Sequence, residues 1–349
     1  MNTKKLKSYL LTSLFILPIL SLSGSINPTT PSEHVIRAAI DIGSGATKLK
    51  VAKINLKTQK IDQVLVNESF SVQYHEELEK SSEGVFNETV MQTGLEALKK
   101  SLEIAQKHQA EKVVAVATAS FRKAANVQEF IDKIYAETGI KVYIIDQHLE
   151  GVLGFQATTA QLPTDPKNVV VWDIGGGSYQ FTTLNTKGEI VVHRGLDASI
   201  PFKNHVIKEI KQEDPNTIST PNPLSRLQLY RAQNHAVDLS KKISDVFKQK
   251  IYHPQTKVVG IGNIFAYGVH PLVDKKTTFT QKDLHDKIQQ LEGKKDRDLG
   301  SSAYVNVAVT NPVLVLGFMQ TLGIHEMDII DVNNADGALL YPAFWDNVL

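Results

Sequence analysis

Apolar positions recur along the chain with two different periods, which predict an alternation of strands and helices from residue 37 onward. Short apolar runs bounded by turn formers predict strands, and apolar residues spaced three and four apart predict helices. In the first half we expect strands at 37–42, 48–54, within 61–74, at 112–118 and at 141–145. Helices are expected after an N-cap at Asn87, over 121–137, and from near Leu149.

The second half repeats this alternation. A meander of strands is expected at 169–174, 179–184 and 189–193, with later strands at 257–261 and 328–332. Helical periodicity covers 223–251, 282–291 and 303–322, and a short helix is expected after Asp336. The turn-rich stretch 162–168 predicts a boundary between an N-terminal domain at 37–161 and a C-terminal domain at 162–349.

The first 25 residues have the layout of a secretory signal. Three lysines precede an apolar run, and small residues follow it. The run is shorter than the ~20 residues that a membrane-spanning helix needs, although an uncleaved anchor is the alternative. We therefore expect a signal peptide at 1–25, a linker at 26–36, and an exported protein that is periplasmic or secreted.

Composition narrows the class of protein. The chain has 349 residues, of which 42% are hydrophobic and 21% charged, as in globular proteins. Lys and Arg number 38 against 37 Asp and Glu, so no overall basic field draws the chain to nucleic acid or anionic lipid. The chain contains no cysteine, which excludes disulfides, thiol catalysis and thiolate metal sites.

One short signature occurs twice, each time after a predicted buried strand. Asp41-Ile-Gly-Ser-Gly opens the first half, and Asp173-Ile-Gly-Gly-Gly-Ser opens the second, 132 residues later. We expect the glycines to form a tight turn with positive φ, whose bare N–H groups hold phosphate oxygens. The aspartates are suited to a hydrated Mg²⁺, and the serines add donors. An ordinary glycine hairpin is the alternative for either copy, but two copies at domain spacing predict a phosphate chain held in a cleft.

These motifs resemble those of the exopolyphosphatase/guanosine pentaphosphate phosphatase (Ppx/GppA) family of the actin/sugar-kinase/Hsp70-like superfamily. Further segments support the resemblance: 117–126, which contains Arg122; the glycine turn at 260–263; and Asp336-Gly-Ala. It implies an α/β fold of two ribonuclease H-like (actin-like ATPase) domains facing across a cleft. It also implies an Mg²⁺-dependent hydrolase of phosphoanhydride bonds.

The resemblance also implies the catalytic base. Glu150 occupies the position of the family's water-activating glutamate, after the strand at 141–145. A carboxylate can accept a proton from water aligned behind a terminal phosphorus. The alternative is a first-turn glutamate that only stabilises its helix. Implied phosphate-binding residues are Gly43, Ser44, Gly45, Arg122, Gly175, Gly176, Gly177 and Ser178, and implied metal ligands are Asp41 and Asp173.

Departures from the family pattern leave the substrate open. Leu149 and Gln180 stand where the family has acidic residues, and Gln180 is expected to orient a water through its amide. Gln180 and the stretch 150–155 are similar to apyrase-like nucleoside tri- and diphosphatases. The alternatives are therefore a secreted apyrase-like enzyme and a catalytically weak binding protein.

The expected partners follow from the interpretation of the chain as a hydrolase of phosphoanhydride bonds. They are polyphosphate, guanosine penta- or tetraphosphate, or a nucleoside tri- or diphosphate as substrate. We expect no nucleic acid and no stable membrane insertion after signal cleavage, and we leave a homodimer open.

Overall fold

The computed structural model describes residues 33–302 and 304–345. The predicted signal peptide and residues 26–32 of the predicted linker lie outside these residues. From Glu33 onward the chain forms one compact unit that contains two β-sheets. The predicted boundary between residues 161 and 162 falls between the last strand of the first sheet and the first strand of the second, and it stays a prediction.

The first sheet is mixed, with strand order β3-β2-β1-β4-β5. β1 pairs with β2 antiparallel and with β4 parallel. The hairpins join neighbouring strands directly, whereas the parallel pairs are joined by helical crossovers. The strands are β1 (His34–Ile42), β2 (Ala46–Asn55), β3 (Lys60–Ser71), β4 (Val113–Ala117) and β5 (Lys141–Ile144).

The second sheet repeats this order and adds one edge strand, giving β10-β11-β9-β6-β7-β8. β6 pairs with β7 antiparallel and with β9 parallel, as β1 does with β2 and β4. The predicted two-fold repetition of a mixed α/β sheet is therefore confirmed. The strands are β6 (Val169–Ile174), β7 (Tyr179–Leu184), β8 (Ile190–Gly195), β9 (Lys257–Ile261), β10 (Thr278–Thr280) and β11 (Glu326–Ile329).

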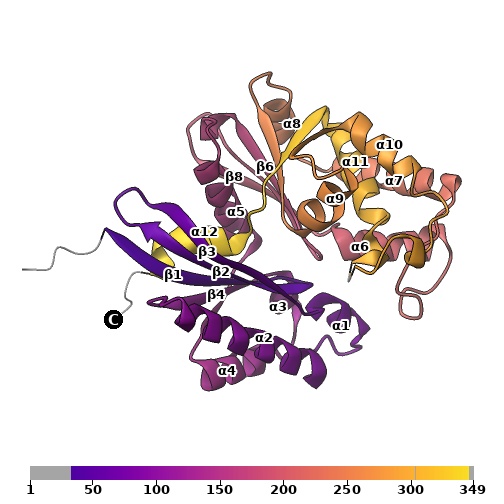
Figure 1. The fold of residues 1–349 in the computed structure, drawn as a ribbon. Helices are drawn as coiled ribbons and strands as arrows, with labels where there is room; N and C mark the ends of the chain where they lie inside the picture. The colour runs from indigo at the N-terminus through magenta and orange to yellow at the C-terminus, as the bar shows by residue number, and fades with distance from the viewer. Residues whose placement is uncertain (1–32, 303, 346–349) are drawn as a thin grey trace, which may run out of the picture. The chain divides into compact units, whose positions relative to one another are not determined.

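Helices cover the sheets (Figure 1). In the first half these are α1 (Tyr74–Lys80), α2 (Glu88–Lys107), α3 (Ala119–Lys123), α4 (Val127–Thr138) and α5 (Gln147–Gln161). In the second they are α6 (Ser199–His205), α7 (Arg226–Ser240), α8 (Asp245–Ile251), α9 (His270–Leu272), α10 (Gln281–Gln289), α11 (Thr310–Leu322) and α12 (Asn334–Leu340). Two π-helical turns, Val206–Ile210 and Ile264–Val269, follow α6 and precede α9.

Several predicted boundaries were wrong. The helix predicted over 121–137 is broken between α3 and α4, because Asn126 bonds both backbone groups of Phe86 through its side chain. The helix predicted over 223–251 is likewise two helices, α7 and α8. The last strand ends at Ile329 instead of residue 332, and α1 was not predicted. The predicted N-cap is confirmed, since the Asn87 side chain accepts from the amide of Val90.

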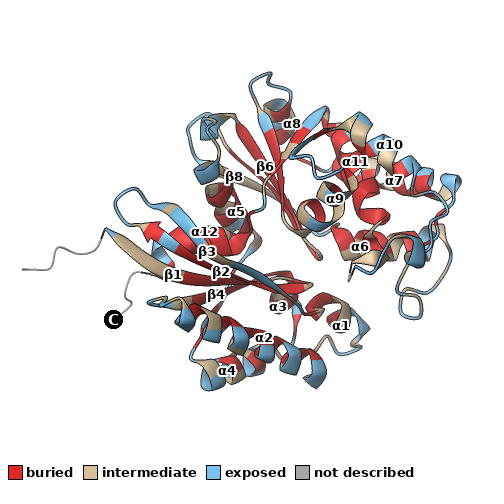
Figure 2. Ribbon diagram, viewed as in Figure 1, coloured by how far each residue is buried: buried red, intermediate tan, exposed pale blue. Residues whose placement is uncertain are grey.

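The buried residues gather on both faces of each sheet (Figure 2). α5 is central to this packing, since Leu153 joins the cluster against the first sheet and Phe155 joins the cluster against the second. α12 packs on the same face of the first sheet as Leu153. Its Gly337 is needed for close approach, because a Cβ there would lie 2.4 Å from the carbonyl oxygen of Leu153.

Among the described residues, one helical stretch is apolar and long enough to pass for a membrane span, namely Val305–Leu322. However, 72% of this stretch is buried inside the protein. It includes α11, whose side chains belong to the largest hydrophobic cluster. Its apolar character is therefore explained by its place in the core.

Candidate active site

The first signature forms the turn between β1 and β2. Asp41 lies near the end of β1 and is only 3% exposed. The amide of Gly43 donates to the carbonyl of Ala46, which closes the turn, and the carbonyl of Ser44 accepts from the amide of His75 at the start of α1. The turn is therefore fixed at its base and by the helix that follows β3.

The second signature forms the equivalent turn between β6 and β7. The amide of Gly175 donates to the carbonyl of Ser178 at 3.1 Å. The carbonyls of Gly175 and Gly176 accept from the amides of Ser199 and Ile200 in α6. Each turn is thus held by carbonyl contacts to a following helix, so the amides of its central residues remain available as donors to a ligand.

The two turns meet each other. A Cβ added to Gly176 would lie 2.9 Å from the Cβ of Ser44, and one added to Gly177 would lie 3.2 Å from the Ser44 hydroxyl oxygen. The structure therefore brings the two signatures together, as the sequence predicted. The positive φ expected at these glycines was wrong, because none of the glycines in the two turns has a positive φ. Glycine is required at 176 for the close approach of Ser44.

A third glycine turn closes around the second aspartate. Gly262, directly after β9, has φ +87°, and a Cβ there would lie 2.5 Å from Oδ1 of Asp173. A side chain at this position would be both strained and in collision with the carboxylate. Asn263 follows, and its buried Oδ1 has no hydrogen-bond partner among the described residues. The turn therefore presents an unused acceptor next to Asp173.

Glu150 lies in the first turn of α5, where the Asp146 side chain caps the helix by accepting from the amide of Leu149. Glu150 is 7% exposed. Its side chain lines a small cavity of about 40 Å³ together with Asp41 and Asp173. The other lining residues include Gly43, Ser44, Thr118, Gly175, Gly176, Gly177, Ser178 and Asn263. The predicted base, the predicted metal ligands and both turns therefore surround one space.

Arg122, at the end of α3, reaches the same place. Its Nη1 donates to Glu150 Oε2 at 2.9 Å and to the carbonyl of Ile145 at 2.7 Å, and its Nη2 lies 3.4 Å from the Ser178 hydroxyl. The guanidinium predicted to bind phosphate therefore lies at the site, where it holds the base and approaches the second turn.

Burial raises the pKa of all three carboxyl groups. Burial raises the pKa of Glu150 to about 8, which Arg122 opposes and the charge of Asp173 reinforces. Burial likewise raises the pKa of Asp173 to about 7, against the attraction of Lys48. Burial also raises the pKa of Asp41. The ionised forms of these carboxyls are therefore costly in the site as it stands, and a nearby cation would stabilise them.

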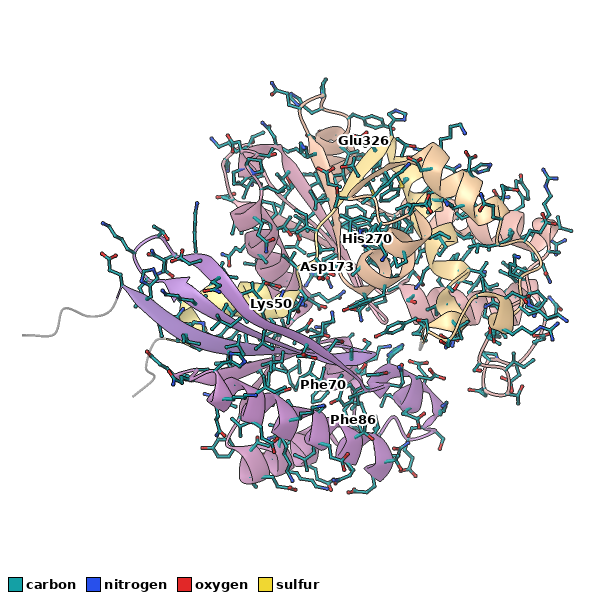
Figure 3. All side chains as sticks on the ribbon, viewed as in Figure 1. Lys50, Phe70, Phe86, Asp173, His270 and Glu326 are labelled. Atoms are coloured by element: carbon teal, nitrogen blue, oxygen red, sulfur yellow. The ribbon has the colours of Figure 1, made fainter. Side chains whose placement is uncertain are left out.

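Two lysines near the site, Lys48 and Lys50, belong to no distinctive sequence motif. In the strand register Lys48 pairs with Asp41, and its Nζ lies 3.7 Å from Asp41 Oδ2. Lys50, which is labelled in Figure 3, lies two residues further along β2. Its Nζ makes a buried ion pair of 2.8 Å with Oδ2 of Asp336 in α12. Only the fold brings Lys50 and Asp336 together, whereas Lys48 could have been identified from its place in the hairpin.

Gln180 occupies the position in the second hairpin that Lys48 occupies in the first, since it pairs with Asp173. It is 1% exposed, and its Nε2 has no hydrogen-bond partner among the described residues. Gln180 is not among the side chains that line the small cavity. Its predicted role in orienting water therefore has no direct contact with the cavity to support it.

The described residues contain no group of three or more His, Cys, Asp or Glu side chains arranged to hold a metal ion. A Mg²⁺ ion needs fewer protein ligands, because it commonly binds one or two carboxylates together with substrate phosphates. Oδ1 of Asp41 is buried without a hydrogen-bond partner among the described residues. Asp41 and Asp173 therefore fit an ion that shares its coordination with the substrate.

A family model described as the Ppx/GppA phosphatase family matches residues 38–193, which include both signatures, Arg122 and Glu150. A bifunctional 3-dehydroquinate synthase/phosphatase from Fusobacterium nucleatum subsp. nucleatum is 31% identical over 165 residues, covering 44% of this chain and 24% of that protein. The chain thus spans about a quarter of the length of this curated relative.

Solved structures share the fold over most of the chain. The Aquifex aeolicus member of the Ppx/GppA protein family has a TM-score of 0.68 at 18% identity, with 90% of this chain and 100% of that chain covered. An exopolyphosphatase from Cytophaga hutchinsonii has a TM-score of 0.68 at 21% identity, with 87% and 96% covered. The chain therefore has the mixed α/β fold with two sheets that these solved structures share. The match of the Ppx/GppA family model to residues 38–193 agrees with the resemblance that the motifs indicated.

Proposed function

We propose that this protein hydrolyses phosphoanhydride bonds in the manner of an exopolyphosphatase, releasing a terminal phosphate by attack of water. The observation that carries the proposal is the shared cavity in which the Glu150 carboxyl lies beside Asp41, Asp173 and both glycine turns. A strongly raised pKa at a buried carboxyl in a cleft is typical of catalytic acids and bases.

Different residues of the site have different roles in the reaction. Glu150 accepts a proton from water as the water oxygen bonds to the terminal phosphorus, and the bond from that phosphorus to the bridging oxygen breaks. The shortened phosphate chain leaves with the electron pair of that bond. Turn amides near Ser44 and Gly176, with the ammonium of Lys48, oppose the charge on the phosphoryl oxygens.

A divalent cation, with Mg²⁺ as the expected ion, is part of the proposal. Asp41 and Asp173 would hold it, and when bound it supplies positive charge to the phosphoryl oxygens. Burial raises the pKa values of both carboxyls, and this supports the assignment because a cation beside them would stabilise their charged forms. A nearby cation also favours the ionised form of Glu150, which is the form that a general base requires.

We also propose that the protein acts outside the cytoplasm, in the periplasm or as a secreted enzyme. The support is the sequence of residues 1–25, with its basic start, short apolar run and small residues. Substrates available there include polyphosphate and nucleotides. Fractionation of cells that express the full chain, followed by detection of the protein in each fraction, tests this proposal.

The activity is tested by measuring phosphate release from polyphosphate, pppGpp, ATP and ADP with the chain that begins at Ile26. We expect release from at least one of these substrates with Mg²⁺ present, and its loss when EDTA removes the ion. Absence of release from all four, by protein shown to be folded, would contradict the proposal. Calorimetric binding of the same substrates without turnover would instead indicate the binding-protein alternative.

A further inference from the structure

A second and much larger cavity adjoins the small one that contains Glu150. Its volume is about 550 Å³, within the range of small-molecule sites. The two cavities share lining residues, namely Ser44, Gly175, Gly176 and Asn263. A molecule whose terminal phosphate lies at Glu150 therefore extends past the two glycine turns into the larger cavity.

The wall of the larger cavity is unsuited to more phosphate. None of the described residues that line it is a lysine or an arginine, and Glu76 contributes a negative charge. His75 is neutral at physiological pH, because burial lowers its pKa to about 4. Moving phosphate anions from water to a place without cations is costly. A long polyphosphate chain therefore finds no partner for its charge here.

The same wall is suited to a planar, neutral group. Tyr267 and Tyr304 are stacked, with ring centroids 5.9 Å apart and an interplanar angle of 17°. Aliphatic side chains from separate segments, including Ile200, Leu272 and Leu299, complete an apolar surface. Tyr267 is 45% exposed, unlike the aromatic residues of the core. Exposed aromatic rings at a cavity wall provide faces against which a heterocycle can stack.

Unsatisfied polar atoms lie around this apolar surface. Oδ1 of Asn263 and both ring nitrogens of His75 are buried without a hydrogen-bond partner among the described residues. His75 is 1% exposed, and its Nε2 comes no closer than 3.6 Å to Oε1 of Glu79. Buried polar groups are normally hydrogen-bonded. Hydroxyl groups and the polar edge of a heterocycle would supply the partners that these atoms lack.

We propose that the larger cavity holds the nucleoside of a nucleoside di- or triphosphate, and that this protein selects nucleotides over inorganic polyphosphate. This inference rests on the proposed function for the placement of the phosphates between the two turns. It narrows the substrate class of that function, because the protein would recognise the nucleoside as well as the phosphates.

ATP and inorganic tripolyphosphate test the inference, because both contain three phosphates and only one carries a nucleoside. Binding is measured by calorimetry with Mg²⁺ and Glu150→Gln protein, so that turnover does not interfere. We expect ATP to bind about tenfold more tightly than tripolyphosphate, a difference typical of one stacked base. Tyr267→Ala should remove most of this preference, and Tyr267→Phe should retain it.

Tyr230→Ala is the matched control, since Tyr230 is 61% exposed on α7 and does not line the cavity. Equal affinity for ATP and tripolyphosphate, or an ATP preference that survives Tyr267→Ala, would overturn the inference even if wild-type protein hydrolyses both compounds. A preference for ATP that depends on Tyr267, in a protein that hydrolyses nothing, would support the nucleoside site and reject the proposed activity.

Discussion

Nη1 of Arg122 lies 2.9 Å from Oε2 of Glu150, and the same nitrogen donates to the carbonyl of Ile145. The arginine is thus fixed by the strand end that precedes α5, and it holds the carboxylate at the cavity. Burial raises the pKa of Glu150, and the guanidinium of Arg122 lowers it, so the ion pair partly offsets the effect of burial on this pKa. Arg122 therefore acts on the base before any phosphate is bound.

The pH dependence of the reaction follows from this pair. A general base works when ionised, and the pKa of Glu150 is raised to about 8. We expect kcat/KM to rise with pH through this region at limiting Mg²⁺. Arg122→Ala removes the group that lowers the pKa, so the rise should move to higher pH. A pH profile of the variant with an unchanged midpoint would show that Arg122 does not tune the base.

The buried charge of Asp173 should lower stability at alkaline pH. Its pKa is raised from 3.8 to about 7 by folding, so its contribution to stability is complete below pH 3.8 and is lost as pH rises through about 7. Without divalent ions, Asp173→Asn should therefore increase the free energy of unfolding at pH 8 by roughly 1–3 kcal/mol. Denaturant titrations at pH 5 and pH 8 measure the effect. A gain that does not grow with pH would contradict it.

The contact between the two turns predicts a steric effect. Gly176→Ala would place a Cβ 2.9 Å from that of Ser44, which forces the turns apart. Because small displacements of reacting groups are costly, we expect kcat/KM to fall by about 100-fold. Adding Ser44→Gly to Gly176→Ala removes the colliding atom and should recover part of the loss. Identical activity of the single and double variants would show that the collision is not the cause.

The ion pair between Lys50 and Asp336 should matter for stability. Both side chains are buried, at 4% and 0% exposure, and Asp336 also accepts from the amide of Asn333, the N-cap of α12. Lys50→Met leaves a buried carboxylate without its partner, which typically costs about 3–5 kcal/mol.

An exposed pair supplies the control for this prediction. Lys99 and Glu137 lie 2.6 Å apart on the surface, so Lys99→Met should change the free energy of unfolding by less than about 1 kcal/mol. Urea titrations of both variants make the comparison. If Lys50→Met and Lys99→Met lower the free energy of unfolding equally, burial does not determine the effect of removing a lysine from its ion pair.

The strands and the position of the site were predictable from local pattern. Asp41 and Asp173 each follow an apolar run and precede glycines, and these short-range features are enough to place both turns at strand ends. Glu150 required the family resemblance, because its local pattern is also that of an ordinary first-turn glutamate. Its position beside both aspartates was an inference that only the fold could test.

What the sequence did not predict depends on contacts between distant residues. Asn126 breaks a helix because it bonds Phe86, 40 residues away. Lys50 meets Asp336 across 286 residues. The larger cavity combines α1, α6 and the segments around Tyr267 and Tyr304. The hydrophobic periodicity of one segment does not predict contacts with distant segments. These contacts form only when the two sheets and α5 pack together.

The role of Glu150 is tested most directly by the rate of phosphate release under single-turnover conditions with saturating Mg²⁺ and substrate. Glu103, which is exposed on α2, provides the matched control. We predict that Glu150→Gln lowers the rate by about 100- to 10,000-fold, the usual contribution of a general base, and that Glu103→Gln leaves it unchanged. A Glu150→Gln protein that releases phosphate as fast as wild type would contradict the account.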